Sequence, residues 1–181
     1  MCYSPGLDRE GNTENGPWAF DNPEDRENLT DGKGCFAISD SDHAGDVELD
    51  TELISPSIDC TSLGQAHLAF RSHFKTYSGS DVFDADISTD GGASWTNLWT
   101  HSVTELREMV ILDISEHAAG QADVKIRFHH YDVLYEYWVQ IDDVRVYDPE
   151  TACTLPESGG FIVGNVSRAG TGIPLNHATV G

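Results

Sequence analysis

Short stretches in which apolar and polar residues alternate recur along this chain, and they constrain its fold more than any other feature. The clearest stretches span residues 68–74, 83–88 and 124–129, and further ones span residues 35–39, 52–58, 95–101, 108–114 and 135–147. Alternation of period two gives a strand one buried and one solvated face. Clusters of Gly, Pro, Asp and Ser separate the stretches, and the helical signal is limited to one turn at residues 115–120. The sequence therefore predicts an all-β fold, an antiparallel jelly-roll β-sandwich.

The composition and the alternation pattern of the sequence change after Tyr147, which indicates a domain boundary. Residues 1–148 are predicted to form one domain, because they contain the strong alternation. Residues 149–160 are polar and rich in Pro and Gly without periodicity, which is typical of a linker. A new β pattern covers residues 161–181 and is too short to close a sandwich of its own. We expect these residues to be the truncated start of another β module.

The net charge restricts the class of partner. With 10 Lys and Arg against 31 Asp and Glu, the formal charge is −21. Such a chain repels phosphate backbones and anionic lipids, so neither nucleic acid nor a membrane is the expected partner, and repulsion favours a monomer. A carboxylate excess with little Lys is common in secreted proteins that use calcium. We therefore expect a secreted or cell-surface protein whose targeting segment has been removed.

Four cysteines, Cys2, Cys35, Cys60 and Cys153, show neither a CxxC motif nor a Cys/His zinc spacing. In an oxidising compartment, a Cys35–Cys60 disulfide would link two neighbouring strands, and a Cys2–Cys153 disulfide would tie the ends of the domain together. Four free thiols are the alternative, because the sequence does not fix the pairing.

Acidic residues in two places are candidate metal ligands. Asp40 and Asp42 stand at alternate positions directly after a strand, and Asp50 follows them. Oxygen ligands in this pattern can converge on a hard cation such as calcium, although solvated loops are the alternative. Asp142 and Asp143 lie in the last strand, where period-two counting brings one of them close to apolar neighbours. A buried carboxylate there requires a bound calcium ion, an ion pair or a bulge.

The segment from Ser88 to Trp95 fits the Asp-box pattern S-x-D-x-G-x-x-W, which also contains Asp90 and Gly92. In such a hairpin the aspartate accepts bonds from backbone N–H groups of the turn, glycine supplies a positive φ, and tryptophan covers the turn. We interpret these residues as a structural turn, because turn closure is the chemistry that the motif provides.

Residues for catalysis are not evident in the sequence. It contains no GxSxG, HExxH, P-loop or GxGxxG motif, so no catalytic residue is predicted. His129 and His130 are adjacent in a strand and so face opposite ways, which prevents both from binding one transition metal. Exposed aromatic rings would instead form a platform for sugar rings, although strand aromatics more often lie in the core. The candidates for this platform are Tyr131, Tyr135, Tyr137 and Trp138.

Several of these segments, taken in order, resemble the MAM-like jelly-roll domains called choice-of-anchor J, which are of the MAM and galactose-binding-like type. These domains are accessory modules of secreted bacterial proteins, notably C-terminal to subtilisin-like serine peptidases, and are similar to the cleaved adhesin domains of gingipains. Residues 159–166 and 172–180 resemble the opening of a carboxypeptidase regulatory-like sandwich. The matching segments of the first domain are residues 18–23, 28–34, 35–42, 50–56, 88–95, 124–128 and 138–144.

The resemblance implies a non-catalytic, calcium-stabilised accessory domain of a secreted multidomain enzyme, with a serine peptidase as the expected parent. It implies that Ca2+ is held by Asp40, Asp42, Asp50 and one of Asp142 or Asp143. The partner would be an extracellular protein, a glycan or the parent's own catalytic domain. A carbohydrate-binding or cell-surface adhesin module is the alternative function.

Overall fold

The structure is a computed structural model that describes residues 8–11 and 18–150. Within these residues the chain forms strands β1 (Asp8–Gly11), β2 (Ala37–Asp40), β3 (Glu48–Ile54), β4 (His67–Lys75), β5 (Val82–Ser88), β6 (Thr96–Ser102), β7 (Leu106–Asp113), β8 (Lys125–Leu134) and β9 (Trp138–Tyr147), with the one-turn helices α1 (Ser41–Ala44) and α2 (Ser115–Ala118). The predicted module at residues 161–181 and most of the predicted linker lie outside the described residues. No helix in the described part is long and apolar enough to cross a membrane.

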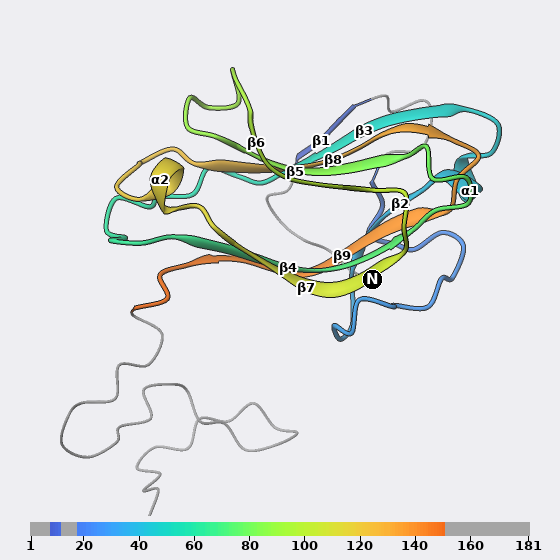
Figure 1. The fold of residues 1–181 in the computed structure, drawn as a ribbon, viewed down its shortest axis with the longest axis horizontal. Helices are drawn as coiled ribbons and strands as arrows, with labels where there is room; N and C mark the ends of the chain where they lie inside the picture. The colour runs from blue at the N-terminus through green and yellow to red at the C-terminus, as the bar shows by residue number, and fades with distance from the viewer. Residues whose placement is uncertain (1–7, 12–17, 151–181) are drawn as a thin grey trace, which may run out of the picture. The chain divides into compact units, whose positions relative to one another are not determined.

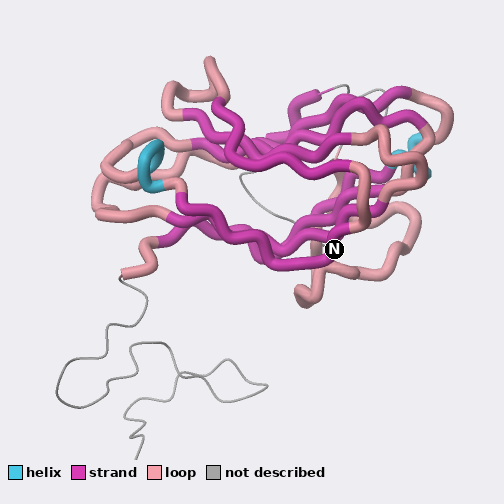
Figure 2. Tube along the Cα trace, in the orientation of Figure 1, coloured by secondary structure: helices cyan, strands magenta, loops and turns pink. Residues whose placement is uncertain are grey.

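The strands form two antiparallel sheets that face each other (Figures 1 and 2). Sheet A has the order β1-β3-β8-β5-β6, and sheet B has the order β2-β9-β4-β7. Neighbours in each sheet come from distant parts of the sequence, as in the β3–β8 and β4–β9 pairs. This arrangement confirms the predicted all-β, antiparallel jelly-roll sandwich.

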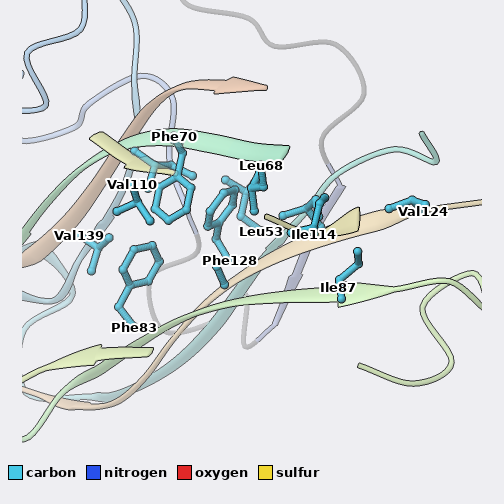
Figure 3. Close-up of a cluster of buried hydrophobic side chains, with 14 of the residues drawn as sticks. Leu53, Leu68, Phe70, Phe83, Ile87, Val110, Ile114, Val124, Phe128 and Val139 are labelled. Atoms are coloured by element: carbon cyan, nitrogen blue, oxygen red, sulfur yellow. The ribbon is translucent and has the colours of Figure 1, made fainter. Parts of the chain in front are cut away.

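The core lies between the two sheets and is built from the apolar residues of the alternating stretches. Phe83, Ala85 and Ile87 of β5 are buried, as the alternation predicts. The rings of Phe70 and Phe128 meet edge to face at 4.9 Å between centroids, across the gap between the sheets (Figure 3). Large aromatic side chains from both sheets thus fill the interior, and Asp84 and Asp86, which alternate with the apolar residues of β5, lie on the outer face of sheet A.

The outer face of sheet B is covered by residues 19–36, here called the covering segment. Gln140 of β9 is fully buried beneath it, accepting a bond from the Leu29 N–H (2.9 Å) and donating one to the Glu27 carbonyl (2.9 Å). Trp138 on the same face packs against Phe36 and Ile38 in a second apolar cluster. The covering segment therefore closes this face around Trp138 and Gln140, whereas Ile111 of β7 stays exposed.

The predicted Cys35–Cys60 disulfide is wrong. Cys60 is a free, buried cysteine, whereas Cys35 is disulfide-bonded to a partner outside the described residues. Cys60 lies beyond the end of β3, in a loop bonded to Gln121 and Gly120, rather than on a strand beside Cys35. Burial, together with the charge of Asp59, raises the pKa of the Cys60 thiol. Cys2 and Cys153, the other two cysteines, lie outside the described residues, and the disulfide at Cys35 rules out their predicted pairing with each other.

Candidate functional site

Asp40, Asp42 and Asp50, which are predicted calcium ligands, form ion pairs with basic side chains. Arg26 of the covering segment donates from Nε to Asp40 (2.9 Å) and from Nη2 to Asp42 (2.7 Å). Asp40 also accepts the backbone N–H of His43 at the start of α1 (3.0 Å). Asp50 lies elsewhere, 2.6 Å from His129 Nε2.

The two aspartates of the last strand also have other partners. Asp142 accepts bonds from Asn28 (3.0 Å) and from the Asp143 N–H (2.8 Å), and Asp143 pairs with Arg71 (3.0 Å). Asp143 has a positive φ of 51° where the pairing of β4 with β9 shifts register, so the ion pair and the bulge are both found here. Among the described residues, no group of three or more His, Cys, Asp or Glu side chains could hold a metal ion. The structure does not bring the five carboxylates together, and calcium stays a prediction.

The turn between β5 and β6 has the bonding that the Asp-box pattern predicts. Asp90 accepts bonds from the Ser94 N–H (2.9 Å), the Ser94 hydroxyl (2.6 Å) and the Ser88 hydroxyl (2.7 Å). These bonds, led by that from the Ser94 hydroxyl, lower the pKa of Asp90 well below its usual value. Gly92 has a φ of 97° and donates its N–H to Ser88. Side-chain bonds therefore close the hairpin, and Trp95 lies directly before β6.

The four predicted platform aromatics do not form one platform. The prediction is wrong for Trp138, which is only 8% exposed and has the cations of Arg26 and Lys75 at 4.5 and 4.7 Å from its ring. Tyr137 is half-buried beside Lys75, whereas Tyr135 is exposed after the end of β8. Tyr131 lies apart from these residues, on the outer face of sheet A.

The loop between β4 and β5 is fixed by a buried acid. The Glu136 carboxylate accepts bonds from the backbone of Tyr77 and Ser78 and from the hydroxyls of Ser78 and Thr76. Burial raises the pKa of Glu136, but these bonds outweigh it and lower that pKa to about 2. The loop thereby holds the exposed ring of Tyr77 at this end of the sandwich.

A serine, a histidine and an aspartate lie in line inside the protein. Ser39 Oγ is 2.9 Å from His130 Nδ1, and His130 Nε2 is 3.5 Å from Asp81 Oδ2. All three residues are fully buried, and burial lowers the pKa of His130. Because no substrate reaches the serine, we interpret this group as a buried polar network rather than as hydrolytic machinery.

The outer face of sheet A carries a group of polar and aromatic side chains that no described segment covers, except at one end where the β5–β6 hairpin rises beside it (Figure 1). Arg127 of β8 bonds to Asp86 of β5 (2.9 Å) and to Glu52 of β3. The Arg127 guanidinium also lies 4.6 Å from the ring centroid of Trp95. We call this group the outer-face cluster, and its members are Glu52, Asp84, Asp86, Trp95, Asn97, Arg127, His129 and Tyr131.

A β-bulge in β6 helps to form the outer-face cluster. Asp86 pairs with Asn97 and Ala85 pairs with Trp99, so Leu98 is the extra residue. The bulge separates Asn97 from Trp99: the Asn97 amide bonds to Asp86 at 3.0 Å, whereas the Trp99 ring packs on Phe83 in the core. Strict alternation would have placed these two side chains on the same face.

Asp84 lies at the centre of the outer-face cluster. The Tyr131 hydroxyl donates to Asp84 Oδ2 at 3.0 Å, and the rings of Tyr131 and His129 stack with centroids 4.4 Å apart. Asp84 is only 9% exposed, and its Oδ1 atom is buried without a hydrogen-bond partner among the described residues. The site thus combines a stacked ring pair with an unused acceptor.

Sequence reasoning found Tyr131 and Trp95 but not the acidic and basic members of the cluster. The alternation of Asp84 and Asp86 with apolar residues was visible and marks them as outward-facing. Their burial on an outer face was not visible, because it depends on side chains from the neighbouring strands β6 and β8.

Comparison with known proteins supports the fold. No protein-family model and no curated protein sequence matches the chain. The K1 cleaved adhesin domain of Lys-gingipain from Porphyromonas gingivalis W83 matches with a TM-score of 0.61 and 14% identity, over 81% of this chain and 92% of that domain. The K2 domain of Lys-gingipain matches with a TM-score of 0.57 and 14% identity, over 78% and 90%.

A carbohydrate-binding structure is also similar. TmCBM61, solved in complex with β-1,4-galactotriose, matches with a TM-score of 0.55 and 17% identity, over 80% of this chain and 89% of that one. At these identities the likeness concerns the fold. The chain therefore has the β-sandwich fold found in adhesin domains and carbohydrate-binding modules.

Proposed function

We propose that this protein is a non-catalytic binding module, secreted or displayed on the cell surface, that recognises a glycan on the outer face of sheet A. The observation that carries the proposal is the unpartnered, buried Oδ1 of Asp84 beside the stacked rings of His129 and Tyr131. The fold shared with adhesin domains and with a galactotriose-bound module supports a glycan as the ligand class. The disulfide at Cys35 supports an oxidising compartment.

The chemistry of the outer-face cluster suits a sugar. A sugar ring offers hydroxyl groups for hydrogen bonds and C–H faces for packing on aromatic rings. Asp84 offers a hydrogen-bond acceptor, and the rings of Tyr131 and His129 offer an aromatic surface. The Trp95 ring, stacked with the Arg127 guanidinium, lies on the same face.

The role of the module beside a peptidase stays a proposal that rests on the family resemblance. Calcium binding stays an untested prediction, and the bonds of Arg26 to Asp40 and Asp42 oppose it at those carboxylates.

The proposal is tested by binding measurements on a panel of neutral polysaccharides that includes β-1,4-galactan. We expect the wild type to bind at least one of them, and we expect Tyr131→Ala to weaken that binding by about tenfold or more, as for a central contact residue. Tyr77→Ala is the matched control, since it removes an exposed tyrosine at the end of the sandwich. If only Tyr77→Ala lost binding, the binding site would lie at the end loops rather than on the outer face of sheet A. If the wild type bound no polysaccharide of the panel, the proposed glycan-binding function would be overturned.

A further inference from the structure

The free oxygen of Asp84 restricts what the outer face can bind. A buried acceptor without a partner has lost its bonds to water and gained nothing in return, which destabilises the free protein. The nearby donors are already used: the Thr100 hydroxyl bonds to Asn97 (3.2 Å), the Asn97 amide bonds to Asp86, and His129 bonds to Asp50. Oδ1 therefore has no protein donor among the described residues, and a ligand hydroxyl reaches it by displacing the side chains that bury it.

The charge of this face points in the same direction. Four carboxylates lie on it, those of Asp50, Glu52, Asp84 and Asp86, against the cations of Lys125 and Arg127. The guanidinium of Arg127 is bonded to Glu52 and Asp86 and stacks on Trp95, so it has little capacity for another anion. A negatively charged ligand would meet repulsion at Asp84, where a hydroxyl donor would meet attraction.

We infer that the outer face selects uncharged sugars, with one sugar hydroxyl donating a hydrogen bond to Oδ1 of Asp84, and that it rejects uronic acids and other anionic sugars. This inference rests on the proposed function and specifies its ligand class. It makes Asp84 a specificity-determining residue. A site that hydrogen-bonds a ligand hydroxyl discriminates strongly against ligands that lack this hydroxyl or carry a negative charge in its place.

The test compares matched ligands by calorimetry. The probes are β-1,4-galactotriose and cellotriose, each alongside its counterpart with C6 oxidised to a carboxylate. We expect a neutral trisaccharide to bind at least tenfold more tightly than its oxidised form. Equal or tighter binding of the oxidised forms would overturn the inference and leave the proposed function standing. If the wild type bound none of the four probes, the proposed function would itself be overturned.

A single substitution separates a binding role for Asp84 from a structural one. We expect Asp84→Asn to weaken binding of the neutral probe by about tenfold, because a charged acceptor forms the stronger hydrogen bond, and to narrow the preference over the oxidised probe. The same variant should melt at the same or a higher temperature, since it removes an unpaired buried charge. Glu108→Gln, an equal charge change at an exposed site on sheet B, should leave binding unchanged. Unchanged binding in Asp84→Asn, or a lower melting temperature with parallel loss of binding, would overturn the role.

Discussion

The two outer faces of the sandwich satisfy their polar side chains in different ways. On sheet B, the covering segment supplies backbone groups, and the amide of Gln140 is bonded at both its oxygen and its nitrogen. On sheet A, polar side chains pair laterally across strands, as in the bonds of Arg127 to Glu52 and Asp86. The covering segment closes part of sheet B with both backbone and side-chain bonds, whereas lateral pairing leaves the outer face of sheet A open and one acceptor of Asp84 unused. The same architecture thus yields one structural face and one face suited to binding.

The largest effect is expected from breaking the covered face. Trp138→Ala removes a buried ring that packs on Phe36 and Ile38 and lies against Arg26. We expect a loss of about 3–5 kcal/mol in the free energy of unfolding, as for other buried aromatic truncations. Denaturant titration measures it, with Ile111→Ala, at an exposed site on β7, as a control that should change stability by less than about 1 kcal/mol. If Trp138→Ala and Ile111→Ala lost similar amounts of unfolding free energy, the packing of the covering segment on Trp138 would contribute little to stability.

A smaller loss is expected from the open face. Arg127→Met keeps the apolar stem but leaves Asp86, whose side chain is 5% exposed, without its cation. We expect destabilisation of about 2 kcal/mol, below the range for fully buried pairs because Arg127 and Glu52 retain some exposure. Arg107→Met removes an exposed pair with Asp31 and should leave the free energy of unfolding nearly unchanged, because water screens such a pair. If Arg127→Met were no more costly than this control, the lateral pairing would not stabilise the face.

The smallest effect is expected from calcium. Because Arg26 is bonded to Asp40 and Asp42, a calcium ion at these carboxylates must first displace the guanidinium. We expect the wild-type melting temperature to rise by about 1 °C or less between EGTA and millimolar calcium, with magnesium as control. Arg26→Ala frees both carboxylates and should enlarge the calcium shift. A rise of several degrees in the wild type would indicate a calcium site with other ligands.

Much of the fold could be predicted from the alternation of apolar and polar residues. The predicted strand at residues 68–74 corresponds to β4, and that at residues 83–88 corresponds to β5. The strand predicted at residues 52–58 begins earlier, at Glu48, and ends at Ile54, before Pro56, which has no N–H to donate to a ladder. Helix α1 was not predicted, because four residues are too few to show a helical period.

The candidate site could be predicted only in part. His129 and His130 face opposite ways, as expected, since one bonds to exposed Asp50 and the other is fully buried. Period-two counting failed at the bulges beside Leu98 and Asp143, because one extra residue reverses the face of those that follow. Trp138 was a candidate for the platform as an exposed aromatic residue, because the sequence does not reveal that a distant segment folds over it.

The bonds of Arg127 have a consequence for the order of folding. The Asp-box hairpin joins residues four apart and can close early, because short loops close fastest. Arg127, in contrast, joins Glu52 across 75 residues and Asp86 across 41. The outer face therefore acquires its shape only when β3, β8 and β5 have come together, so the surface proposed to bind a glycan exists only in a chain whose sheet is already complete.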